Sequence, residues 1–276
     1  MAGQANQIFS PSNYAEFFST WEDNPSAVLF AGATGLIRGQ GRMILDLPPL
    51  IISLDKLEEL HRISRTERYL EIGAMVKLNQ IINLGKVVPG IFRDCLENIG
   101  GLQIRNMATI GGNICSPEGR LDCPAALCAL DAQYELKNAQ TSRWISALRF
   151  SSLPGLSALG LRELLTRIRI PIDQWDISAY IKFSGQAIRS KAAVFLAKTQ
   201  KNTLSDIRFI YKADSILRDR NSESILVGKR LPISRRIAAD FVDHWGTFLS
   251  GAENVDELSK KELINFIEKN VYNLTE

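Results

Sequence analysis

Histidine is the scarcest residue type in this sequence, with two copies, His61 and His244, among 276 residues. A histidine-based metal site or catalytic triad is therefore not expected. Cysteine is also rare, and none of the four copies forms a C-x-x-C pair, which argues against a zinc ribbon or a ferredoxin-type cluster. We interpret the cysteines as buried, reduced thiols. They are Cys95, Cys115, Cys123 and Cys128.

A large excess of charge of one sign is missing too. The 33 basic and 30 acidic residues leave a net charge of +3, which is too balanced to favour binding to nucleic acid or to a membrane surface. No run is long and apolar enough to span a bilayer. Residues 1–10 lack the basic and apolar regions of a signal peptide, so we expect a cytoplasmic location.

A glycine pair with a hydroxyl and an amide beside it is the most informative segment that is present, Thr109-Ile110-Gly111-Gly112-Asn113. Adjacent glycines let a backbone approach a ligand and adopt positive φ. Successive N–H groups in such a turn form a concave surface that holds an anion. The pattern suits a diphosphate bound by main chain. A glycine pair alone also marks ordinary turns, and that alternative stays open.

A second small-residue loop lies near the N-terminus, in Leu29-Phe30-Ala31-Gly32-Ala33-Thr34-Gly35-Leu36. The apolar start predicts a buried strand, and the small residues predict a turn with exposed backbone. Two such strand-and-loop segments could grip one extended ligand from two sides.

Hydrophobic periodicity predicts helices over 12–22, 77–84, 90–99, 124–130, 235–249 and 256–272. It predicts a hairpin over 60–75 and strands over 28–31, 133–137, 179–184, 192–198 and 205–211. Residues 165–170 alternate apolar and basic side chains, which is typical of an edge strand. Strands followed by helices after Glu163 indicate a separate α+β lobe.

The glycine pair belongs to a longer pattern, Gln103-Ile104-Arg105-Asn106 followed by Ala108 to Ile114, then Pro124 to Leu127 and Ala129 to Ala132. With it the chain, roughly from Phe9 to Tyr272, resembles the FAD-binding medium subunit of the molybdenum hydroxylase family, the xanthine dehydrogenase and carbon monoxide dehydrogenase relatives. The resemblance implies an α+β protein. It has an FAD-binding fold of two α+β subdomains, like that of vanillyl-alcohol oxidase (PCMH type), and a small C-terminal α+β lobe with an antiparallel sheet and helices. We expect the FAD-binding domain over 1–172, with a subdomain boundary near 55, and the lobe over 173–276.

The resemblance also assigns residues to FAD. Residues 29–36 match the first diphosphate loop and residues 109–113 match the second. Asp122 falls where a carboxylate bonds the FAD hydroxyls, although it could also cap the helix that begins at Pro124. Apolar Ile99 and the backbone of Leu165 fall near the flavin. Lys182 falls near its polar edge, with a solvated strand lysine as the alternative.

The implied function is that of an FAD-binding electron-transfer subunit, active only within a molybdenum-containing hydroxylase or dehydrogenase complex. An iron–sulfur small subunit and a molybdenum-cofactor large subunit are the implied partners, and NAD is one candidate for the external acceptor. No catalytic residue and no metal ligand are expected in this chain. Two alternatives remain, a stand-alone flavin oxidoreductase of the same fold and a scaffold subunit that has lost FAD. Ala33 favours the scaffold, because the first loop of the family commonly reads Ala-Gly-Gly.

Overall fold

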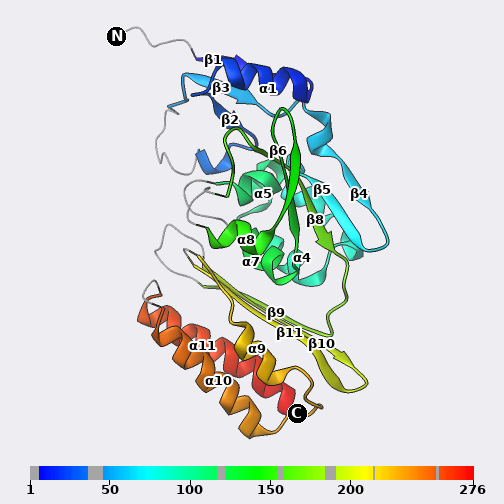
Figure 1. The fold of residues 1–276 in the computed structure, drawn as a ribbon, viewed down its shortest axis with the longest axis vertical. Coiled ribbons are helices and arrows are strands. Elements are labelled where there is room, and N and C mark those ends of the chain that lie inside the picture. Colours follow the sequence, from blue (N-terminus) through cyan, green and yellow to red (C-terminus); the bar gives the residue numbers. More distant parts are fainter. Residues whose placement is uncertain are drawn as a thin grey trace.

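The computed structural model describes residues 6–36, 46–116, 122–153, 158–183, 191–213, 215–252 and 255–276. Figure 1 shows three sheets with their helices, following one another along the long axis. The predicted α+β class is confirmed, with two α+β units and a C-terminal lobe. The predicted boundaries near 55 and at 172 fall after strand β3 (Leu50–Ser53) and after strand β8 (Leu164–Pro171), and they stay a prediction.

The N-terminal unit contains a parallel three-stranded sheet and helix α1 (Tyr14–Asp23). The sheet has the order β1-β3-β2, with β1 at Gln7–Phe9 and β2 at Val28–Phe30. Helix α1 begins at Asn13, whose side chain accepts a hydrogen bond from the N–H of Glu16 at 2.9 Å. Strands β1 and β3 were not predicted, because segments of three and four residues are too short to show a period.

The middle unit contains an antiparallel five-stranded sheet of order β4-β5-β8-β6-β7. Besides β8, the strands of this sheet are β4 (Ile63–Arg65), β5 (Tyr69–Gly73), β6 (Gln133–Lys137) and β7 (Ser142–Ser146). Short helices connect and cover them. They are α3 (Leu78–Ile82), α4 (Gly90–Glu97), α5 (Leu102–Met107), α6 (Ile110–Ile114), α7 (Cys123–Ala129) and α8 (Ala147–Ser152), together with the 3-10 turns η1 (Glu58–His61) and η2 (Gly85–Val87).

Strand β8 is central in this sheet, so the prediction of an edge strand over 165–170 is wrong. The alternating basic residues of β8 are ion-paired with carboxylates of the neighbouring strands. Arg167 and Arg169 both bond the carboxylate of Glu71 on β5, at 2.9 and 2.7 Å. Arg167 also bonds Glu135 on β6, at 3.1 Å. Carboxylates on β5 and β6 therefore neutralise the arginines of β8. This pairing lowers the free-energy cost of the partial burial of the arginines.

The C-terminal lobe is an antiparallel sheet of order β12-β11-β10-β9 followed by three helices. Its strands are β9 (Ile177–Phe183), β10 (Lys191–Gln200), β11 (Thr203–Lys212) and β12 (Ile216–Leu217). Its helices are α9 (Arg220–Leu226), α10 (Arg235–Ser250) and α11 (Glu257–Tyr272), and the 3-10 turn η3 (Asn273–Thr275) ends the chain. Residue 184 of the predicted strand lies outside the described residues. None of the described helices is long and apolar enough to cross a membrane.

This sheet separates two hydrophobic cores, as Figure 1 shows from the helices on either side of it. On one face, Phe195 and Phe209 pack with Trp245 of α10, whose ring centroid lies 4.5 Å from that of Phe209. On the other face, Val194 and Leu196 join the core of the FAD-binding part of the chain. The C-terminal lobe is thus packed firmly against helix α7, which contacts both β10 and β11.

Candidate functional site

A cavity of about 420 Å³ lies between the N-terminal and middle units. Most of the residues assigned to FAD from the sequence line it. They are Leu29, Phe30, Ala31, Gly32, Ala33, Thr34, Gly35, Leu36, Thr109, Gly111, Gly112, Asn113 and Leu165. The structure does not bring Ile99, Ile110, Asp122 or Lys182 into the lining. The size and mostly apolar walls are those of a cofactor pocket.

The first loop follows the end of β2 and comes into direct contact with the segment that precedes the glycine pair. A Cβ atom on Gly32 would lie 2.2 Å from the carbonyl oxygen of Met107. Only glycine allows this approach, and it joins the two segments that form the cavity. In the described part of the chain, the N–H groups of Ala31, Gly32 and Ala33 have no hydrogen-bond acceptor. They are therefore suited to an anionic group of a ligand.

Ala33 adopts a left-handed backbone conformation, with φ of 57°. This conformation costs an L-residue about 1–2 kcal/mol, and glycine avoids the cost. The departure from Ala-Gly-Gly noted in the sequence thus introduces a local strain in the loop.

The variant Ala33→Gly is expected to raise the free energy of unfolding by about 0.5–1 kcal/mol, since relief of strain exceeds the added chain entropy of glycine. FAD affinity is expected to stay the same or to improve. Urea denaturation of the apo-protein measures the first quantity and FAD titration the second. The matched control is Ala31→Gly in the same loop, where φ is not positive and a small loss of stability is expected. Equal losses in both variants would contradict this account.

The second segment differs from the predicted loop. Residues Ile110–Ile114 form helix α6, and neither Gly111 nor Gly112 has positive φ. Thr109 caps the helix, since its Oγ1 accepts the N–H of Gly112 at 3.0 Å. The N–H groups of Ile110 and Gly111 donate to the carbonyls of Val76 and Ala74, at 3.0 and 2.8 Å. The prediction of a concave set of free N–H groups is therefore wrong for this segment, because backbone carbonyls and the hydroxyl of Thr109 already accept their hydrogen bonds.

The glycines of α6 serve close packing instead. A Cβ atom on Gly111 would lie 2.8 Å from both the Cβ and the carbonyl oxygen of Ala74. Gly112 is exposed toward the cavity, and a Cβ atom there would meet only Oγ1 of its own cap, Thr109, at 2.9 Å. Gly111 thus fixes α6 against the end of β5, whereas Gly112 leaves room on the cavity side.

Asp122 and Lys182 form an ion pair next to the cavity and not within its lining. Nζ of Lys182 lies 2.9 Å from Oδ2 of Asp122 and also donates to the carbonyl of Asn98, at 3.3 Å. The Asp122 side chain makes no capping bond to α7, so the alternative role as a helix cap is wrong. Lys182 is exposed on strand β9, as the alternative of a solvated strand lysine expects, and it is paired as well, so its place near the flavin stays a prediction. Ile99 and Ile110 are core residues, at 7% and 0% exposure.

Glu163 lines the cavity and was not predicted to. Both of its oxygens accept hydrogen bonds from Arg143, at 2.7 and 2.6 Å, and Gly160 donates its N–H at 2.6 Å. The bonds from Arg143 hold the pKa of the Glu163 carboxyl below its usual range. The sequence held no local signal for this role of Glu163, because Arg143 lies on β7, distant in the sequence. Other lining residues that sequence reasoning missed are Trp21, Val28, Leu54, Ala74, Met75, Ala108, Cys115, Ser116, Leu159 and Leu164.

Comparison with known proteins identifies the family of the chain. The family model described as the FAD binding domain in molybdopterin dehydrogenase matches residues 4–173. The glyceraldehyde dehydrogenase medium chain of Sulfolobus acidocaldarius is 30% identical over 76% of each chain. The nicotine 6-hydroxylase medium subunit of Paenarthrobacter nicotinovorans is 27% identical over 81% of this chain and 80% of its own.

Solved structures show the same fold. Quinoline 2-oxidoreductase from Pseudomonas putida 86 matches with a TM-score of 0.82 at 20% identity, covering 100% of this chain and 98% of that one. The Cu,Mo-CO dehydrogenase matches with a TM-score of 0.80 at 22% identity, covering 100% and 99%. The resemblance read from the sequence is confirmed. The chain belongs to the family of FAD-binding domains of molybdopterin dehydrogenases, and it is an FAD-binding oxidoreductase subunit.

Proposed function

We propose that the chain holds FAD in the cavity between its first loop and helix α6, and that it works as an electron-transfer subunit. It receives electrons from an iron–sulfur partner and passes them to an external acceptor, for which NAD is one candidate. The observation that carries the proposal is the meeting of the two segments at Gly32. Beside it lies a cavity lined by loop residues 31–33, whose N–H groups have no acceptor among the residues that the structure describes.

The residues present fit FAD. Loop residues 31–33 offer N–H groups to the diphosphate, and the space beside Gly112 lets it approach the backbone. The apolar walls exclude water from the flat ring systems. When bound, FAD supplies the redox chemistry, and the chain supplies position and surroundings. Ile99, Asp122 and Lys182 remain proposed contacts, from a cluster that adjoins the cavity.

The proposed partners are an iron–sulfur small subunit and a molybdenum-cofactor large subunit. This rests on the relatives, several of which are named as medium chains or FAD subunits. We also propose a cytoplasmic location. The four free thiols support it, because cysteines stay reduced in the cytoplasm.

The purified chain is expected to bind one FAD noncovalently and to show negligible turnover by itself. Isolated from its native cells under mild conditions, it is expected to carry iron and molybdenum with it, because the proposed donor centres lie on the partners. FAD titration, activity assays and metal analysis of the same preparation make the test. Turnover by the FAD-loaded chain alone would favour the stand-alone flavoenzyme. An assembled complex whose medium chain takes up no FAD would favour the scaffold.

A further inference from the structure

Helix α7 joins the C-terminal lobe to the rest of the protein. Every residue from Cys123 to Ala129 is buried, and the helix packs on β10 and β11 on one side and on α4 and α8 on the other. The family match ends at residue 173. Among the described residues, none from the C-terminal lobe lines the FAD cavity. Apart from the FAD contact proposed for Lys182, an influence of the lobe on this cavity therefore passes through a shared element such as α7.

The C-terminal end of α7 carries a residue that is locally unfavourable. The N–H of Ala132 bonds the carbonyl of Leu127 at 2.9 Å and the N–H of Asp131 bonds that of Cys128 at 3.2 Å, which is the Schellman pattern. The left-handed position of that pattern favours glycine, but here it is Asp131, with φ of 52°. A carboxylate at this end of a helix also meets the negative end of the helix dipole.

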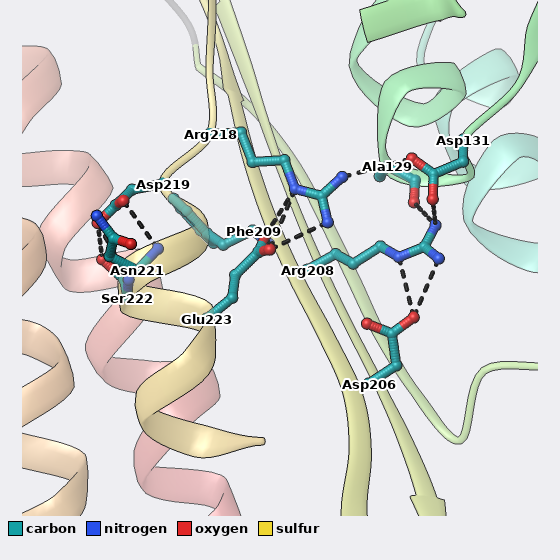
Figure 2. Close-up of polar contacts among 10 residues, drawn as sticks. All are labelled: Ala129, Asp131, Asp206, Arg208, Phe209, Arg218, Asp219, Asn221, Ser222 and Glu223. Atoms are coloured by element: carbon teal, nitrogen blue, oxygen red, sulfur yellow. Dashed lines mark hydrogen bonds and ion pairs between the residues drawn. The ribbon is translucent and has the colours of Figure 1, made fainter.

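Figure 2 shows two arginines of the C-terminal lobe at this end of α7, where their positive charges offset these local costs. Arg208 places Nη1 at 2.7 Å from the carbonyl of Ala129, the last residue of α7, and at 2.9 Å from Oδ2 of Asp131. Arg218 approaches Oδ1 of Asp131 at 3.4 Å. We call Asp131, Arg208 and Arg218 the Asp131 clamp.

Both arginines are held in place within the lobe. Arg208 is bonded by Asp206 at 3.0 Å and lies over the ring of Trp175. Arg218 bonds Glu223 at 2.9 Å (Figure 2). Their side chains are only 13% and 8% exposed, so the clamp is little screened on the arginine side. The side chain of Asp131 is 48% exposed, so the defined geometry of the clamp comes from the two fixed arginines and not from burial of the whole pair.

The opposite end of α7 reaches the cavity. The N–H of Cys123, at the start of the helix, donates to Oδ1 of Asn113 at 3.1 Å, and Asn113 lines the cavity. A shift of α7 along its axis would therefore move a residue of the cavity wall.

We propose that Asp131 is a positioning residue for FAD, through which the C-terminal lobe holds α7, and with it Asn113, in the place that FAD binding requires. A backbone outlier that the surrounding structure holds in place points to such a role. The inference rests on the proposed FAD site. It does not involve the partner subunits.

The variant Asp131→Gly in the full chain separates positioning from local stability. Glycine suits the left-handed position and removes the charge from the helix end, so a merely structural role predicts unchanged FAD binding. We expect the Kd for FAD to rise about fivefold or more, the lower end of coupling between distinct sites. We also expect a changed visible absorption spectrum of the flavin at saturation. The matched control is Lys201→Gly, which replaces another left-handed residue, at the β10–β11 turn, and should leave both readouts unchanged.

Two substitutions at Arg208 make the second test. Arg208→Met should weaken FAD binding as Asp131→Gly does. Arg208→Lys should retain part of the wild-type affinity, since lysine keeps the positive charge but lacks the bidentate guanidinium. If Asp131→Gly does not fold, the Arg208 pair decides alone. Wild-type affinity in the folded variants would overturn the inference. A wild-type chain that binds no FAD would overturn both the inference and the proposed site, and so the wild-type titration tells the two failures apart.

Discussion

Replacing Gly32 with alanine is expected to weaken FAD binding by the full-length chain severely. The new Cβ would lie 2.2 Å from the carbonyl oxygen of Met107 and 3.0 Å from its carbon, which are backbone atoms that no rotamer change can move. The first loop must therefore separate from the segment before α6, and the cavity between them loses its shape. We expect a loss of affinity on the order of 100-fold, or about 2.7 kcal/mol, and a loss of stability of about 1–3 kcal/mol.

Gly35→Ala is the matched control for this variant. Gly35 belongs to the same loop and lines the same cavity, but its Cβ would meet only Oγ of Ser116, at an ordinary 3.7 Å. Its stability is expected to stay within about 0.5 kcal/mol of wild type, as for a substitution without a named defect. Calorimetric FAD titration and thermal unfolding of both variants make the comparison. Wild-type affinity in Gly32→Ala would show that the contact with Met107 does not shape the FAD site.

The sequence located both sides of the cavity but misjudged the chemistry of one. The small residues in 31–35 and 109–113 indicated that the backbone of both segments closely approaches another group. They could not tell whether that neighbour was a ligand or the protein itself. For Gly111 the neighbour is Ala74, which comes from a remote part of the chain. The anion-binding turn expected at 109–113 is therefore a helix start whose first N–H groups are bonded to the 74–76 segment.

The fold could be read where a period is long, as in α10 and α11, whose 16-residue patterns predicted helices within a residue or two of their ends. It could not be read where partners are distant. Arg167 and Arg169 looked like an exposed edge, because Glu71 on the neighbouring strand β5 balances both from far away in the sequence. The Asp131 clamp was equally hidden, since a lone aspartate after a helix gives no sign of two arginines in another lobe.

Substitutions at the two glycines of α6 are expected to have different effects, because Gly111 packs against Ala74 and Gly112 lies on the cavity side. Gly111→Ala places a methyl group against Ala74 and strains two backbone hydrogen bonds, so the apo-protein should lose about 1–3 kcal/mol of stability. In Gly112→Val the Cβ atom meets only the hydroxyl of Thr109 and the side chain is on the cavity side, so the apo-protein should lose about 1 kcal/mol, the value of a helix cap.

FAD binding should respond in the other order. The branched side chain at position 112 occupies the space through which the backbone and the FAD diphosphate approach each other, so Gly112→Val should take up no FAD while its C-terminal lobe stays folded. Urea denaturation of each apo-protein gives the stability, and amide hydrogen exchange in α10 and α11 reports whether the C-terminal lobe stays folded. FAD titration of the same samples gives the affinity. Full flavin occupancy in Gly112→Val would mean that α6 only supports the first loop and that the diphosphate lies elsewhere, because a valine facing the cavity leaves no room for both.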